Sequence, residues 1–161
     1  MKKMLKSTSA AGAAVAFLLV LAACAPEART PQVEIEKPWV RLPATPRQPG
    51  AAYFKLEGNM EGMRLLDVTS PLVRWVELHE SVEKKGVTRM ERRKEVEFPS
   101  RGALEFEPGG RHAMLFGINP SVKPGTTIPL TFSFNTAPPV TVDAEVRSAS
   151  GEPAPHHEDK R

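Results

Sequence analysis

The chain has 161 residues, with 22 Lys and Arg, 19 Asp and Glu, and one Cys. This length suffices for one domain with a single hydrophobic core. One Cys excludes an intrachain disulfide and any site built from several Cys side chains.

Residues 1–23 have the features of an export signal. Lys2, Lys3 and Lys6 precede a short apolar run that ends in small residues. A membrane-spanning helix needs about 20 apolar residues, so we predict a signal peptide that is removed. Its three Lys account for the whole excess of basic over acidic residues, so the mature chain is nearly neutral. We therefore expect no nucleic-acid partner.

The end of this segment, LAAC at 21–24, resembles a bacterial lipobox. In such lipoproteins the Cys becomes the new N-terminus and is acylated. The resemblance implies that Cys24 is lipidated and anchors the protein to a membrane in the periplasm. Ala25, in place of Asp, implies the outer membrane. The alternative is an ordinary secretory signal that is cleaved nearby.

The rest of the chain predicts a tether at 24–32, a β domain at 33–147 and a flexible tail at 148–161. Within the domain, β-branched, aromatic or alternating stretches are separated by Pro, Gly and Asn. Eight or nine such strands predict an all-β fold, an antiparallel Greek-key barrel or sandwich. Trp39 and Trp75 are expected to anchor its core. The predicted strands are VEIEKPWVR, AAYFKLEG, MRLLDVTS, LVRWVELHE, VTRMERRKEVEF, ALEFE, HAMLFGI, TIPLTFSF and VTVDAEVR.

The predicted domain contains only two histidines, His79 and His112. In the stretch HAM, His112 and Met114 are two residues apart on an expected strand. Side chains at this spacing project to the same face about 6 to 7 Å apart. One strand therefore presents an imidazole nitrogen and a thioether sulfur in the same direction.

The stretch LHESVEKKGVTRM predicts a hairpin with a polar turn. If the turn is centred between Lys84 and Lys85, His79 lies directly opposite Met90, with Cβ atoms about 4.5 to 5.5 Å apart. A bulge would shift the pair to a diagonal that a Met side chain still spans. The sequence thus yields two His and Met pairs that together could supply two nitrogens and two sulfurs to one metal ion.

The donor set selects the metal. Neutral, soft thioethers suit Cu(I), whereas zinc, calcium and magnesium prefer thiolate, imidazole or oxygen donors. We therefore predict a copper site, with Cu(I) as the main form and Cu(II) as a second one. For either pair alone, the ordinary interpretation is a core Met and a structural His. The spacing of all four residues favours a metal site over this ordinary interpretation.

The spacing H-x10-M-x21-H-x-M, which begins at His79 and ends at Met114, resembles the motif of the periplasmic copper chaperones called the PCu(A)C family. The blocks WVRLP, AAYFKL, VELHE, GVTRM and PGGRHAML are similar to blocks of that family, in the same order. The resemblance extends over residues 33–146. It implies a cupredoxin-like domain in which His79, Met90, His112 and Met114 bind Cu(I).

The resemblance also implies a function, which is not that of an enzyme. The family delivers copper toward the CuA centre in subunit II of cytochrome c oxidase, often beside a thioredoxin-like, thiol-bearing assembly protein. Copper storage or resistance, and a lipoprotein interaction module without metal, are the alternatives. A blue-copper centre needs a Cys thiolate and is excluded. The sequence also lacks the G-x-S-x-G motif of many hydrolases.

Other candidate copper ligands are Met60 and Met63, for which core packing is the plainer interpretation, and the tail residues His156 and His157, which are more simply solvated. A basic cluster lies around Met90 and either docks an acidic partner or protects a strand edge. Its members are Arg89, Arg92, Arg93 and Lys94.

Overall fold

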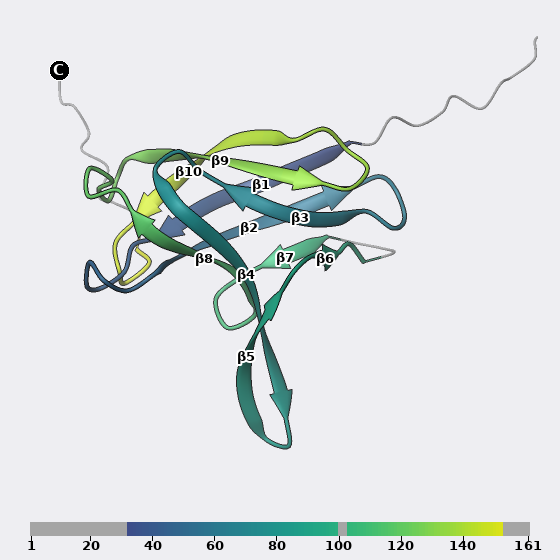
Figure 1. Ribbon diagram of the computed structural model, residues 1–161, viewed down its shortest axis with the longest axis horizontal. Helices are drawn as coiled ribbons and strands as arrows, with labels where there is room; N and C mark the ends of the chain where they lie inside the picture. Colours follow the sequence, from purple (N-terminus) through teal and green to yellow (C-terminus); the bar gives the residue numbers. More distant parts are fainter. Residues whose placement is uncertain (1–31, 100–102, 153–161) are drawn as a thin grey trace, which may run out of the picture.

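The computed structural model describes residues 32–99 and 103–152 as a β domain (Figure 1). The predicted signal peptide, Cys24, nearly all of the tether and the two tail histidines lie outside these residues. No helix in the described part of the chain is long and apolar enough to cross a membrane. The strands are β1 (Val33–Arg41), β2 (Gly50–Gly58), β3 (Arg64–Thr69), β4 (Val73–Lys84), β5 (Val87–Arg93), β6 (Val96–Glu97), β7 (Leu104–Phe106), β8 (Arg111–Ile118), β9 (Thr127–Phe134) and β10 (Val140–Arg147).

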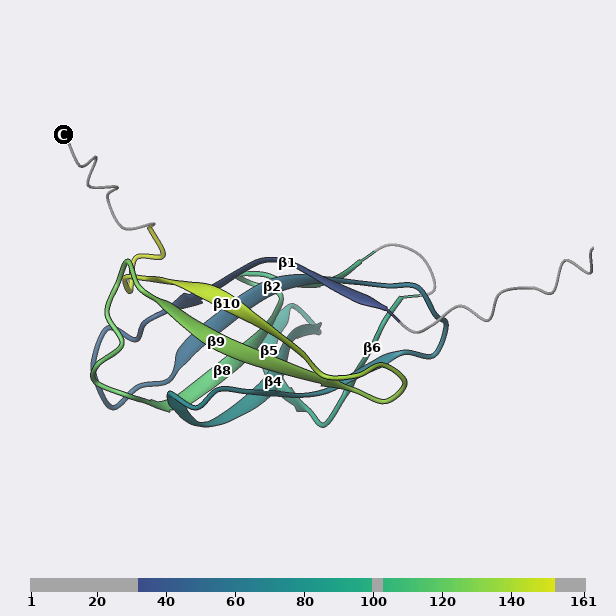
Figure 2. The same ribbon diagram turned by 90° about the horizontal axis from the view of Figure 1, so that it is seen from above.

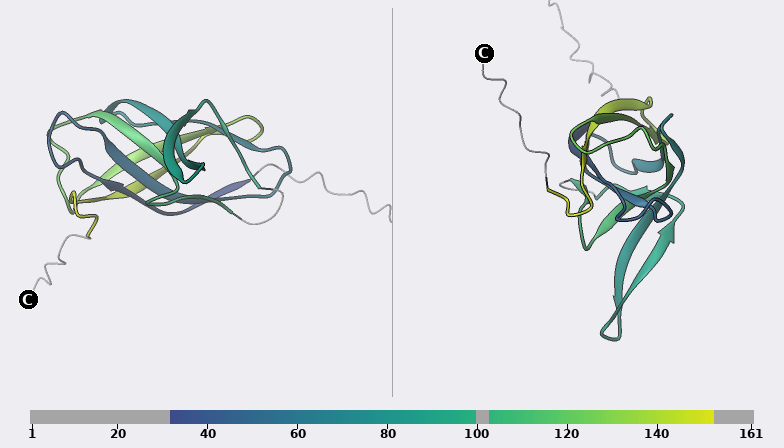
Figure 3. Two further views of the ribbon diagram at one scale, coloured as in Figure 1. Left: turned by 90° about the horizontal axis from the view of Figure 1, so that it is seen from below. Right: turned by 90° about the vertical axis from the view of Figure 1, so that its left-hand side faces the viewer.

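The strands form one sheet in the order β5-β4-β8-β2-β1-β10-β9-β3-β6, and β7 pairs with β2. The neighbours are antiparallel except for β1 and β10, which are parallel, so the sheet is mixed. It is rolled, so that β3 contacts β4 across the seam, and the end-on view in Figure 3 shows the enclosed interior. The predicted all-β class is therefore confirmed, with one parallel pair added.

The core lies inside the rolled sheet. Strand β9 alternates strictly, and its Ile128, Leu130 and Phe132 are fully buried. Phe54 of β2 stacks on Phe106 at 4.4 Å between ring centroids and meets Phe132 edge-on at 4.8 Å. Alternation with period two places one face of each strand in the core, which explains why the strand pattern was readable in the sequence.

One predicted strand is divided in two. The stretch from Val87 to Phe98 forms β5 and then β6, with a break at Lys94 and Glu95. Strand β5 pairs with β4, whereas β6 pairs with β3 through Val96 and Glu97. The chain therefore changes partners at the break, which a pattern of alternating residues does not reveal.

Strands β4 and β5 form an arm that projects from the rolled sheet (Figure 1), and in the view from above the arm is foreshortened (Figure 2). Its turn consists of Lys85 and Gly86, whose φ angles are 55° and 75°. Two consecutive positive φ angles are typical of a type I′ turn, in which the second position favours Gly. The turn predicted between Lys84 and Lys85 was therefore wrong by one residue, because a turn centred there would place Lys at both strained positions.

This shift changes the register of the arm. Met90 lies opposite Ser81, and Arg92 lies opposite His79. The predicted direct pairing of His79 with Met90 was therefore wrong. Moving the turn centre by one residue shifts the pairing by two, and side chains alternate with period two. Met90 thus keeps its predicted face and occupies a diagonal position next to His79.

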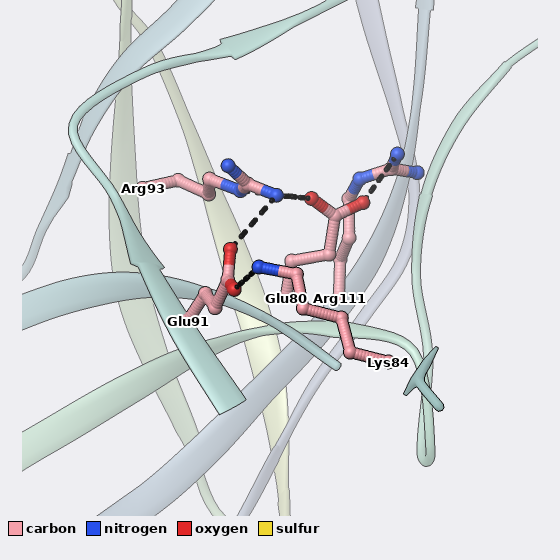
Figure 4. Close-up of polar contacts among 5 residues, drawn as sticks. All are labelled: Glu80, Lys84, Glu91, Arg93 and Arg111. Carbon is pink, nitrogen blue, oxygen red and sulfur yellow. Dashed lines mark hydrogen bonds and ion pairs between the residues drawn. The ribbon is translucent and has the colours of Figure 1, made fainter. Parts of the chain in front are cut away.

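Ion pairs link the two strands of the arm on its other face. Figure 4 shows Glu80 between two guanidinium groups, that of Arg111 at 2.7 Å and that of Arg93 at 2.8 Å. Arg93 also reaches Glu91, which pairs with Lys84. The hydrogen bond from Lys84 lowers the pKa of Glu91 below its ordinary value. We call these five residues the ion-pair ladder.

Candidate metal centre

The two histidines of the domain lie side by side on the outer face of the sheet. His79 of β4 is directly opposite His112 of β8, and their ring centroids are 5.9 Å apart with an interplanar angle of 23°. Their strand neighbours Leu78 and Ala113 form the adjacent pair and point into the core, where they are 4% and 0% exposed. The core on one face therefore fixes the position of the imidazoles on the other.

The two methionines flank this histidine pair from opposite sides. Met114 lies two residues beyond His112 on the same strand face, opposite Glu77 of β4. Met90 lies on the arm, diagonal to His79 across β4 and β5. Diagonal neighbours are about 7 to 8 Å apart, within reach of long side chains. The structure thus places all four predicted residues on one face, with Met114 beside the pair and Met90 approaching from the arm.

His112 has one ring nitrogen free for a ligand. The residue is 8% exposed, and its Nδ1 lies 3.1 Å from the carbonyl oxygen of Gly110. A carbonyl only accepts hydrogen bonds, so Nδ1 carries the proton and Nε2 carries the lone pair. Burial lowers the pKa of His112 below its ordinary value, with smaller contributions from His79 and Arg41. The imidazole is therefore neutral at pH 7, the form that binds metals.

His79 is bonded at its other nitrogen. Its Nε2 lies 3.0 Å from Oε2 of Glu77, and the two side chains are only 14% and 21% exposed. Its Nδ1 is buried and has no hydrogen-bond partner. A buried polar atom without a partner is costly, and one explanation is an absent ligand. Here the unpaired atom belongs to an imidazole beside a second imidazole.

The methionines differ in exposure. Met90 is 56% exposed, whereas Met114 is half-buried. Beyond Met114, the same face continues with Trp75 and Phe116, which stack at 5.0 Å between centroids and 6° between planes. Trp75 is 45% exposed, so the expectation that it anchors the core was wrong. Trp75 alternates onto the same outer face of β4 as His79, two strand repeats away.

Two residues of this face make contacts that the sequence analysis did not assign. Glu77 contacts His79, and Arg92 contacts the other oxygen of Glu77 at 3.5 Å. The signal for Glu77 was its spacing in VELHE, because residues two apart on a strand share a face. The turn predicted between Lys84 and Lys85 would already put Arg92 on this face, opposite Glu77, but the contact between the two side chains was not assigned.

Two other candidate donors, Met60 and Met63, do not join this centre. Met63 is fully buried and packs near Phe98, so it fills the core, as its plainer interpretation had it. Met60, which is 37% exposed, lies in the loop between β2 and β3. In the basic cluster, Arg92 and Arg93 are paired with acidic residues of β4, and Arg92 is exposed like Arg89 and Lys94.

Two imidazoles and two thioethers make a neutral donor set. Such a set suits a soft ion such as Cu(I) better than zinc, calcium or magnesium. In the residues that the structure describes, no three His, Cys, Asp or Glu side chains gather into a metal-binding group. The residues of this face therefore fit copper through their combination of His with Met.

Comparison with known proteins relates the chain to proteins described as lipoproteins. The model of the family described as "Putative lipoprotein LpqE-like" matches residues 33–146. The chain is 29% identical over 160 residues to a protein of Leifsonia xyli subsp. xyli named "Putative lipoprotein Lxx21020", with 92% of this chain and 93% of that protein covered.

Solved structures share the fold. The apo PCuAC domain of PmoF2 is 27% identical with a TM-score of 0.63, covering 76% of this chain and 94% of that domain. Its copper-bound form is 26% identical with a TM-score of 0.61, covering 72% and 92%. CuI-DR1885 of Deinococcus radiodurans, 24% identical, has a TM-score of 0.55 and coverage of 78% and 81%. The resemblance to PCu(A)C domains predicted from the sequence is confirmed.

Proposed function

The chain belongs to the LpqE-like lipoprotein family, and from this premise we propose that it is a copper chaperone that binds Cu(I) outside the cytoplasm. The ligands in this proposal are His79, Met90, His112 and Met114. The protein is a carrier rather than an enzyme, and copper is its cargo. Related PCuAC domains, one of them copper-bound, support this assignment.

The observation that carries the proposal is the direct pairing of His79 with His112 beside Met114. His112 and Met114 follow His79 by 33 and 35 positions in the chain, yet the pairing of β4 with β8 brings all three residues to one face. The lone pair of His112 Nε2 and the unpartnered Nδ1 of His79 are both available to a metal. Met90, from the arm, completes the set of four donors.

The exposure of Met90 suggests how copper leaves. A carrier must bind the ion tightly enough to keep it from other ligands and still release it to a recipient. Thioethers are neutral and weakly held compared with thiolates, so an incoming Cys or His can replace one at a time. Met90 is the most exposed of the four and is therefore the first donor that a recipient would displace.

We propose the CuA domain of cytochrome c oxidase subunit II as the recipient, with a thioredoxin-like thiol protein as a helper. This part rests on the resemblance of the sequence to the PCu(A)C family. Copper storage or resistance is the second candidate. The lipid on Cys24 would hold the domain at the membrane surface, and its placement in the outer membrane stays a prediction.

Anaerobic competition with a chromophoric Cu(I) chelator tests the site. We expect one tight equivalent of Cu(I), which the double variant Met90→Leu and Met114→Leu loses. Met60→Leu is the matched control, because Met60 is also exposed but lies outside the face. Equal binding by all three proteins would refute the site.

A second measurement tests the destination. The Cu(I)-loaded protein is mixed with a metal-free CuA domain, and the appearance of copper in that domain is followed. Transfer to the CuA domain supports a role in oxidase assembly. Retention of the copper, with the site itself intact, favours storage.

A further inference from the structure

Glu77 makes a contact that the four proposed ligands do not explain. Its Oε2 lies 3.0 Å from His79 Nε2, and its Oε1 lies 3.5 Å from Nη1 of Arg92. The carboxylate is 21% exposed and stands directly opposite Met114. It is therefore an acidic group within the donor face, although copper in its Cu(I) form has little affinity for carboxylates.

The hydrogen bond decides which nitrogen of His79 carries a proton. An ionised carboxylate only accepts hydrogen bonds, so its neighbour Nε2 must carry the proton. A neutral imidazole has one ring proton, and the lone pair is then on Nδ1. This is the atom that is buried without a partner. The bond to Glu77 therefore assigns the lone pair to the nitrogen that has no partner in the fold.

For His112, a main-chain group decides which ring nitrogen carries the proton. Its Nδ1 donates to the carbonyl of Gly110, which leaves Nε2 for the metal. The two histidines therefore present different nitrogens, Nδ1 from His79 and Nε2 from His112. A backbone carbonyl cannot be removed by substitution of a side chain, whereas the carboxylate of Glu77 can. A substitution at Glu77 can therefore change the tautomer of His79, whereas no side-chain substitution removes the partner of His112.

We propose that Glu77 is a positioning residue for copper binding, which fixes the His79 tautomer with Nδ1 toward the ion. This inference rests on the proposed function. Hydrogen bonds to the far nitrogen of a ligating His orient the ring and increase its basicity, and their loss costs about 10- to 100-fold in metal affinity. Arg92 steadies the carboxylate from the arm, so Glu77 also joins β5 to the ligand strand β4.

The test compares Glu77→Gln and Glu77→Ala with the control Glu83→Gln. Glu83 lies on the same face of β4, opposite Thr88 in the exposed arm, so its variant removes an equal charge from the same strand. Proton–nitrogen correlation spectra of the imidazoles, recorded on metal-free protein at mildly alkaline pH, identify the protonated nitrogen. Thermal unfolding checks that each variant is folded.

We expect wild type and Glu83→Gln to hold His79 in the Nε2–H form, and both Glu77 variants to show a mixture of tautomers. Cu(I) affinity should fall by about tenfold or more in the Glu77 variants alone. An unchanged tautomer would overturn the proposal, and so would an unchanged affinity despite a changed tautomer. Wild-type protein without copper affinity would instead refute the proposed function, because the tautomer is read without metal.

Discussion

The rolled sheet and the β4–β5 arm hold their donors in different ways. His79, His112 and Met114 lie on strands whose other face packs into the core, where Leu78 and Ala113 are buried. From Ser81 onward, β4 pairs only with β5, and the arm is linked by surface ion pairs. The sheet therefore fixes three donors, while the fourth is carried by a segment with fewer restraints. In the proposed function, tight binding and release of copper therefore belong to different parts of the molecule.

The largest effect is expected from a donor of the sheet. His112→Ala removes a nearly buried proposed ligand, and the neighbouring imidazole of His79 is itself already assigned to the site. The Cu(I) affinity should fall by more than about 100-fold, because loss of a ligand exceeds the loss of a partner outside the coordination sphere. Competition with a chromophoric chelator measures this loss. A decrease of only a few-fold would place copper elsewhere.

The two methionines allow a direct comparison between sheet and arm. Met90→Leu should weaken Cu(I) binding by about tenfold, or about 1.4 kcal/mol, and Met114→Leu should weaken it more. Leu preserves volume and removes only the sulfur, so folding is little affected. Parallel Cu(I) titrations of the two variants measure the ratio of their affinities. If Met90→Leu proves the more damaging, the arm is the main holder of the ion.

The turn of the arm sets the position of Met90. Gly86→Ala places a Cβ at a φ of 75°, and this left-handed conformation costs about 1 to 2 kcal/mol. We expect the free energy of unfolding to decrease by an amount near the lower end of this range, because the arm can fray without opening the core. Gly86→Asn is the control, since Asn tolerates this conformation better. Urea unfolding of both variants measures the difference, and equal stability would refute the turn type.

The smallest effect is expected from the ion-pair ladder. Arg93→Ala removes the contacts to Glu80 and Glu91, and exposed ion pairs contribute about 0 to 1 kcal/mol each. The melting temperature should therefore change little, while Cu(I) affinity falls a few-fold because the arm is less restrained. NMR relaxation should show faster motion at Met90 but not at Met114. Lys94→Ala, which changes an exposed cation nearby, should leave both unchanged.

The sequence was most informative where one face of a strand enters the core. Alternation predicted the extents of β1, β9 and β10 correctly, and it placed His112 and Met114 on a shared face. Alternation failed as a guide where neither face of a strand packs into the core. On the arm, the register depends on the φ angles of Lys85 and Gly86, which only the turn type determines.

The contacts around the donors were equally hard to predict. The pairing of His79 with His112 requires knowledge that β4 and β8 are neighbours, although more than thirty residues separate them in the chain. Glu77 was not singled out from the sequence, because its hydrogen bond to His79 depends on side-chain orientation. Trp75 was assigned to the core by its residue type, yet alternation along β4 places it on the outer face.

X-ray absorption at the copper edge, on protein loaded with one equivalent of Cu(I), reports the ligand atoms themselves. We predict both imidazole nitrogen and thioether sulfur scattering from wild-type protein. The sulfur contribution should decrease in Met90→Leu and disappear in the double variant with Met114→Leu. A first coordination shell of nitrogen and oxygen alone, unchanged in these variants, would contradict a site built from two histidines and two methionines.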